Sequence, residues 1–96
     1  MKLFLISQKQ NDDYDTFNAA VVAAPDEETA RQMHPGTGEP VEDWKDRFSS
    51  WCSGQKHVVV KLIGEAADDV KQGVVCASYN AGLQANANYP TRREGR

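Results

Sequence analysis

The sequence contains few of the features that identify secreted or membrane proteins. Cysteine occurs only twice in 96 residues, at Cys52 and Cys76, which is too few for the disulfide framework of a small secreted domain. We expect both to be reduced thiols. The apolar run at residues 3–6 is shorter than a signal-peptide h-region of roughly 7–15 residues, and no stretch approaches the ~18 apolar residues of a membrane span. These absences predict a protein that stays in the cytoplasm and has no membrane partner.

A strong excess of one charge is also missing. Acidic residues number 14 and basic residues 11, for a formal net charge of −3. That balance does not mark the chain as a nucleic-acid or membrane binder. Three arginines, Arg92, Arg93 and Arg96, lie close to the end of the chain, but they come without a stacking platform for bases. We expect no nucleic-acid partner.

Complete metal sites and catalytic motifs are absent from the sequence. The two histidines and two cysteines offer no closely spaced pair of the kind that zinc sites use. Asn11, Asp13 and Asp15 copy the start of a calcium loop, but the required glycine and glutamate do not follow. No nucleophile elbow surrounds Ser78, and there is no glycine-rich phosphate loop. We therefore expect no metal, no cofactor, no catalytic residue and no enzymatic activity.

The residues that are present predict one small α+β domain. Apolar residues make up 40% of the chain, which is enough for one modest core. Consecutive apolar or β-branched residues between turn formers indicate strands. The four expected strands are 2–7, 16–23, 57–66 and 73–80.

Asp26 is expected to be the N-cap of a helix, with acidic residues following in the first turn. The helix should end near Met33, because Pro35 disfavours the α conformation at the residue before it. Glu27 and Arg31 are four residues apart and can pair on its surface, while Ala30 and Met33 should face inward.

A second, short helical segment is expected over residues 41–50. Trp44, Phe48 and Trp51 recur at the i, i+4 and i+7 positions of one helical face. Three aromatic side chains so close together should be covered, because each buries a large apolar area.

The predicted order of elements is ββαββ in a four-stranded mixed sheet. The strands at 2–7 and 73–80 have the most continuous apolar runs, so we expect them side by side in the centre, in the order 2-1-4-3. The second face of such a sheet needs cover, either from the segment 44–51 or from another subunit. Residues 1–83 form the domain, and residues 84–96, which lack periodicity, are expected to be a flexible tail.

This topology gathers polar residues from several strand ends at one rim of the sheet. Open sheets often bind ligands at such ends, so the rim is the candidate ligand or partner site. The alternative is that polar residues simply terminate strands. The candidate residues are Tyr14, Asp15, His57, Ser78, Tyr79 and Asn80.

Several segments together resemble a group of small proteins encoded by bacteriophages and by prophages in bacterial genomes. They are MKLFLISQ, YDTFNAAVVAAPDEETAR, HPG, the spaced tryptophans, LIGEA and VVCASYNAG. The resemblance covers residues 1–82. No activity is established for the group, so the resemblance assigns no catalytic or binding residue.

The resemblance implies a context, the host cytoplasm, in which small phage proteins commonly act by binding. The leading hypothesis is a non-enzymatic protein that binds a host protein or complex and antagonises a host factor or a defence system. The alternative is a protein that sequesters a small, nucleotide-like ligand, with a homodimer as one form that it could take.

Overall fold

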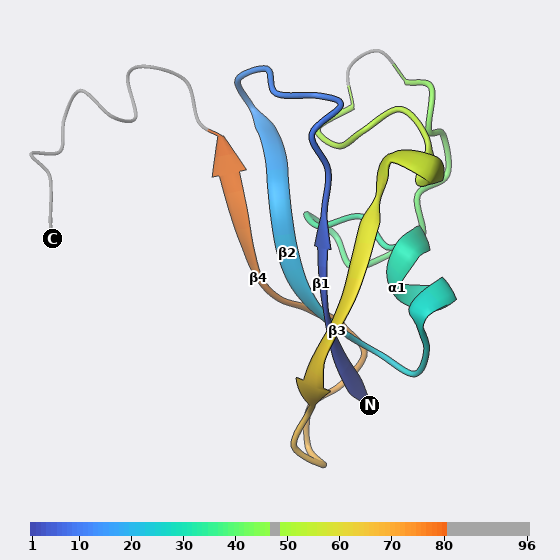
Figure 1. The fold of residues 1–96 in the computed structure, drawn as a ribbon, viewed down its shortest axis with the longest axis vertical. Helices are drawn as coiled ribbons and strands as arrows, with labels where there is room; N and C mark the ends of the chain where they lie inside the picture. Colours follow the sequence, from blue (N-terminus) through green and yellow to red (C-terminus); the bar gives the residue numbers. More distant parts are fainter. Residues whose placement is uncertain (47–48, 81–96) are drawn as a thin grey trace, which may run out of the picture.

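The computed structural model describes residues 1–46 and 49–80 and shows a small α+β domain with a four-stranded antiparallel sheet (Figure 1). The predicted α+β class and number of strands are therefore confirmed. The predicted tail, residues 84–96, lies outside the described residues. The elements are β1 (Lys2–Ser7), β2 (Thr16–Ala24), α1 (Glu27–Gln32), the 3-10 helix η1 (Gln55–His57), β3 (Val59–Glu65) and β4 (Gly73–Asn80).

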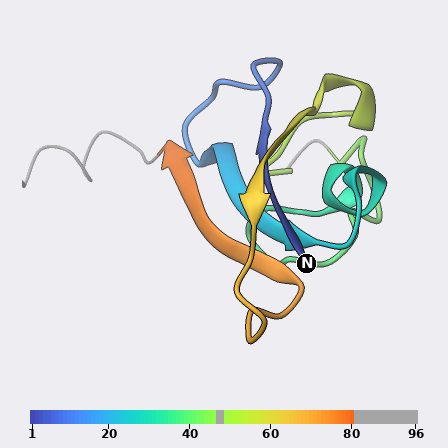
Figure 2. The ribbon, with the colours of Figure 1, turned by 60° about the horizontal axis from the view of Figure 1, so that its bottom comes forward.

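The predicted strand order is wrong. The sheet runs β3-β1-β2-β4, and every neighbouring pair is antiparallel, so the sheet is not mixed. The hairpin between β1 and β2 forms as expected. β3 and β4 do not pair, and lie at opposite edges of the sheet. The chain between them, residues 66–72, passes from one edge to the other at the end of the sheet (Figure 2).

The physical reason for the error lies in β4. Its apolar run suggested a strand buried on both faces, but Val75, Cys76 and Ala77 are exposed. The central position belongs to β2, whose last residues are buried on both faces. The edge position of β4 also explains the different burial of the two free cysteines, because Cys52 is buried and Cys76, in β4, is exposed.

The helix α1 forms as the sequence predicts. The side chain of Asp26 caps it by accepting a hydrogen bond of 2.8 Å from the backbone N–H of Thr29. Hydrogen bonding to Thr29, first to its side chain and then to its backbone N–H, holds the pKa of the Asp26 carboxyl below its ordinary value. Arg31 pairs with Glu27 at 3.0 Å, and Ala30 is buried.

The predicted helical segment at 41–50 is not a helix where the structure describes it. Residues 41–46, 49 and 50 form turns and irregular structure, and Phe48 lies outside the described residues. The i, i+4 and i+7 spacing therefore did not reflect a helix. The prediction that these aromatics would be covered holds for Trp51, which is buried, and Trp44 packs against the same core as a half-buried residue.

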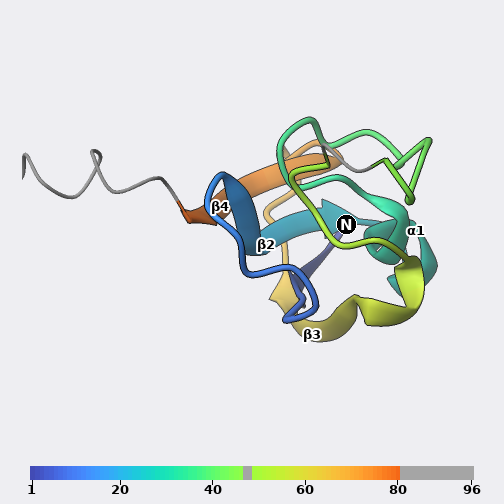
Figure 3. The same cartoon turned by 90° about the horizontal axis from the view of Figure 1, so that it is seen from above.

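The core lies on one side of the sheet only. Figure 3 shows α1 and the described parts of the following connection, residues 33–46 and 49–58, on the same side, where they cover alternate residues of the central strands. Side chains from β1 and β2 pack there against Met33, Trp51, Cys52 and Val58. The sheet residues that are buried in this core are Phe4, Ile6, Ala20, Val22 and Ala24.

The opposite side of the sheet lacks such a layer in the described part of the chain. Ala23 is fully buried there but does not belong to the core cluster, which fits its position at the end where the 66–72 connection crosses. Away from that end, the side chains of Leu5, Ala19 and Val21 are only half-buried. The sheet therefore has one face that packs a core and one that does not.

No helix in the described residues is long and apolar enough to cross a membrane.

Candidate functional site

Four of the six predicted site residues meet at one corner, where β2 begins and β4 ends. The side-chain amide of Asn80 donates to the backbone carbonyls of Asp12 and Asp13, at 3.2 and 3.1 Å. The backbone N–H of Asp15 donates to the carbonyl of Asn80. Tyr14 is exposed beside Asp15. The amide of Asn80 thus holds the β1–β2 connection in place, and its donors are already used.

Asp15 and Tyr79 lie together at the same corner. Asp15 adopts a left-handed backbone with φ of 65°, a conformation that aspartate tolerates better than most residues. Desolvation raises the pKa of Tyr79, and the negative charge of Asp15 and a hydrogen bond with it raise it further. The ring of Tyr79 packs edge-on against Phe17, with centroids 4.7 Å apart. The corner is a packed junction with an exposed phenol.

The other two predicted residues lie elsewhere. His57 ends η1, just before β3, and so lies at the edge of the sheet opposite β4. Its predicted position beside Asn80 depended on the strand order that the structure contradicts. Ser78 belongs to β4 but alternates with Tyr79, so its side chain faces the other side of the sheet.

His34 forms a histidine–serine pair that the sequence did not indicate. Its Nε2 lies 3.1 Å from the Oγ of Ser50, while its Nδ1 accepts a hydrogen bond of 2.9 Å from the backbone N–H of Gly36. An Nδ1 that accepts carries no hydrogen, so in the neutral ring Nε2 carries it and donates to Ser50. His34 therefore does not act as a base toward the Ser50 hydroxyl in this arrangement.

The same pair predicts a pH dependence of stability. Burial lowers the pKa of His34 below its ordinary value of 6.5, so the folded state resists protonation more than the unfolded chain does. The stability contributed by neutral His34 should be complete above pH 6.5 and should fall as the pH drops through the lowered pKa. Thermal unfolding of the wild type should lose more stability between pH 7.5 and 5 than that of His34→Gln.

His57→Gln is the control for removing a histidine away from the pair of His34 and Ser50, at the end of η1. If the wild type and His34→Gln lose stability in parallel over this range, burial of neutral His34 is not the cause of the pH dependence.

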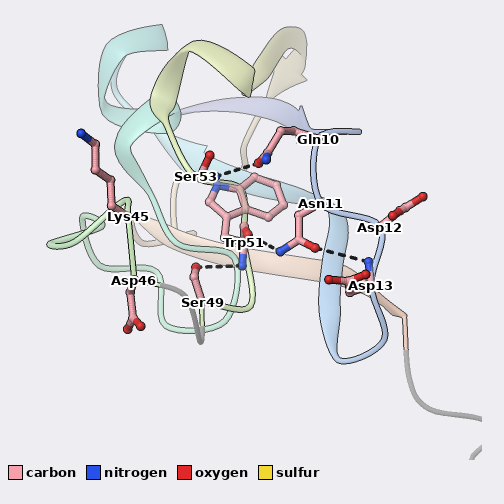
Figure 4. A pocket seen from close by; sticks show the side chains of 9 residues that line it. All are labelled: Gln10, Asn11, Asp12, Asp13, Lys45, Asp46, Ser49, Trp51 and Ser53. Carbon is pink, nitrogen blue, oxygen red and sulfur yellow. Dashed lines mark hydrogen bonds between the residues drawn. The ribbon is translucent and has the colours of Figure 1, made fainter.

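A polar pocket of about 300 Å³ lies between the β1–β2 connection and residues 45, 46 and 49–53 (Figure 4). Most of its polar groups already bond to one another. The side-chain amide of Asn11 donates to the carbonyl of Trp51 at 3.0 Å, and Gln10 Oε1 accepts from the backbone N–H of Ser53 at 2.9 Å. Ser49 Oγ accepts from the backbone N–H of Trp51 at 3.1 Å. These hydrogen bonds link the β1–β2 connection to residues 49–53, so the polar groups of the pocket serve to hold the two segments together.

A second cleft, of about 510 Å³, lies beside His34 and Ser50, and acidic residues line it. They include Glu39, Glu42 and Asp43. Across residues 1–46 and 49–80, no group of three or more histidine, cysteine, aspartate or glutamate side chains could hold a metal ion. The cleft is therefore negatively charged, but its described residues do not form a metal-binding site.

The uncovered side of the sheet carries two cross-strand rows of side chains, which we call the open face. Residues directly opposite each other in antiparallel strands share a face, so the register defines both rows. The first row is Lys61, Leu5, Val21 and Cys76, and the second is Val59, Ser7, Ala19 and Ser78.

The open face is mostly apolar, and Lys61 is its one charged residue. A shallow hollow of about 200 Å³ lies over β2, between Leu5 on one side and Cys76 and Ser78 on the other. The small side chain of Ala19 and the side chain of Val21 also line it. The arrangement suits contact with apolar groups of another molecule.

Of these open-face residues, only Ser78 was among the predicted site residues, although the sequence carried a signal for the others. The continuous apolar run of β1 places Phe4 and Ile6 on one face and Leu5 on the other, which indicated two apolar faces. The sequence predicts that the segment 44–51 or another subunit covers the second face. Trp51 packs instead on the same side as α1.

Comparison of the chain with protein-family models, with curated proteins and with solved structures gave no match.

Proposed function

We propose that this chain is a non-enzymatic binding protein that contacts a macromolecular partner through the open face. The observation that supports the proposal is an apolar sheet face with no covering layer in the described residues. A contiguous apolar patch on the surface of a protein often marks an interaction site. Leu5 and Val21 lie at the centre of this one, with Lys61, Ser7 and Ser78 around them.

The shape of the open face favours a protein partner over a small ligand. Ligand pockets usually enclose about 300–1,000 Å³ and surround most of the ligand. The hollow on the open face is smaller, about 200 Å³, and shallow. An apolar, shallow surface is typical of protein–protein contacts. We therefore prefer a protein partner to the alternative, a small nucleotide-like ligand.

The context of the proposal comes from the resemblance to phage and prophage proteins. In the cytoplasm of an infected host, a small binding protein of this kind would block a host protein or complex, for example a component of a defence system. The tautomer of His34 supports a non-enzymatic role, because the histidine–serine pair is arranged with the histidine as donor.

Leu5→Lys tests the proposal. It places a positive charge in the middle of the open face, where a bound apolar partner would have to desolvate it. The purified variant should stay folded and should lose at least about 90% of the partner captured from host lysate by the wild type, a cost of about 1.4 kcal/mol or more. Quantitative mass spectrometry of the captured proteins provides the measurement.

Leu62→Lys is the matched control. Leu62 is 55% exposed and pairs with Phe4, so it lies on the helix side of the sheet at the β3 edge. The same chemical change there should leave capture unchanged. Equal loss in both variants, or no loss in Leu5→Lys, would show that the open face is not the binding surface.

A further inference from the structure

The two edges of the sheet differ in a way that bears on self-association. Free strand edges are templates for pairing with another chain, and proteins usually protect them with charges, prolines or covering elements. β3 carries Lys61 and Glu65, and the carbonyl of Val58, which precedes it, accepts a hydrogen bond of 2.6 Å from Arg31 of α1. β3 is therefore a protected edge.

β4 has none of these protections. Its eight residues, Gly73–Asn80, include no charged residue and no proline. In the described part of the chain, β2 is its only strand neighbour, and Figure 1 shows β4 alone at its edge of the sheet. The register shift between Val21 and Val22 leaves Val75 unpaired as a bulge. The second register shift of this pair, between Phe17 and Ala19, puts its extra residue on β2, so Cys76–Asn80 has no bulge of its own and can accept another strand.

We propose that the occupant of this edge is β4 of a second copy of this chain, in antiparallel pairing. Two identical strands can meet this way around a two-fold axis normal to the sheet, which is the geometry of an isologous dimer. With no charge in the strand, no like charges come face to face, which would destabilise the pair. The result is a continuous eight-stranded sheet.

The stretch Cys76–Asn80 determines the register. Its middle residue is Ser78, so the axis passes there, and Ser78 faces Ser78 of the second copy. Ala77 then lies opposite Tyr79 of the second copy on the helix side. Both residues are exposed in the single chain, so a small and a large side chain fit together without displacing the core.

The dimer also addresses the small size of the open face. Four strands about 4.8 Å apart, each contributing two side chains about 6.8 Å apart, cover roughly 19 by 14 Å. Each partner in a standard interface contributes about 800 Å², which is several times more. A two-fold axis normal to the sheet puts both open faces on the same side and makes them continuous. This argument from size rests on the proposed function, whereas the edge argument does not.

Sedimentation equilibrium on the full chain tests the dimer without any partner. From about 10 µM to 1 mM, the wild type should approach twice its mass of 10.6 kDa. Ala77→Lys places a charge on the β4 edge without touching the open face, and should weaken self-association at least tenfold. Leu62→Lys, on the other edge, and Leu5→Lys, on the open face, should leave it unchanged. All four proteins are compared by circular dichroism to confirm folding.

A wild type that stays monomeric over this range would overturn the proposal. So would dissociation by Leu5→Lys but not by Ala77→Lys, which would indicate packing of face on face. A double variant with Ser78→Cys and Cys76→Ser provides a second measurement. A short thiol cross-linker should join its two chains through position 78, because this position lies on the two-fold axis of the dimer. A dimer that gives no cross-link there would contradict the register. Neither of these two experiments measures partner capture. A negative result for the dimer therefore does not decide whether the open face binds a partner, which the capture experiment with Leu5→Lys tests separately.

Discussion

Trp51→Ala is expected to lower the free energy of unfolding by about 3–5 kcal/mol, as removal of a large buried aromatic side chain does. Trp51 is 1% exposed and lies in the core against the sheet. It follows a connection with little regular structure of its own, so the indole supplies much of the apolar contact that holds this connection to β1 and β2. Equilibrium urea unfolding, with unchanged slope, provides the measurement.

Two variants make this prediction specific. Trp44 is only half-buried, so Trp44→Ala should cost clearly less than Trp51→Ala. The indole N–H of Trp51 is buried with no hydrogen-bond partner in the described residues, so Trp51→Phe removes an unpaired polar group along with part of the ring. Trp51→Phe should therefore recover much of the loss. A cost below about 1 kcal/mol for Trp51→Ala would mean that the indole is not part of the core.

Gln8→Ala is expected to cost about 2–3 kcal/mol, although Gln8 is a polar residue at the end of a strand. Its side chain is 6% exposed and makes three hydrogen bonds. Nε2 donates to the carbonyls of Asn11 and Phe17 at 2.7 and 3.0 Å, and Oε1 accepts from the N–H of Asn11 at 2.8 Å. Without these partners, backbone groups in the turn lose their hydrogen bonds in a partly buried place.

Gln10→Ala is the matched control for Gln8→Ala. Gln10 is exposed and its side chain accepts one hydrogen bond, from Ser53, so its loss should cost about 0.5–1 kcal/mol. Thermal and urea unfolding of both variants give the comparison. Equal costs would show that the network around Gln8 does not stabilise the connection.

Features that depend on neighbours in the sequence could be predicted. The helix α1 is an example, because Asp26, Thr29, Glu27 and Arg31 interact within one or two turns. The β1–β2 hairpin is another, because the strands are adjacent in the chain. In both cases the interaction that forms the element lies inside the segment from which it was predicted.

Features that depend on distant pairing could not be predicted in the same way. The apolar run of β4 reads alike whether the strand is central or at an edge, because burial depends on which strand lies beside it. β4 pairs with β2, more than fifty residues earlier in the chain. The position of His57 followed from that strand order, so it was misplaced with it. Likewise, nothing near Ser50 in the sequence indicates that His34 is its partner.

The path of the 66–72 connection has a consequence for how the chain folds. Because β3 and β4 are neighbours in sequence but attach to opposite edges, each must find a strand far behind it in the chain, β1 for β3 and β2 for β4. Closing such large loops costs entropy before any pairing compensates it, so a topology of this kind folds slowly for its size. The β1–β2 hairpin is the only strand pair that can form locally. It is therefore the natural nucleus of folding, and the outer strands join once it is in place.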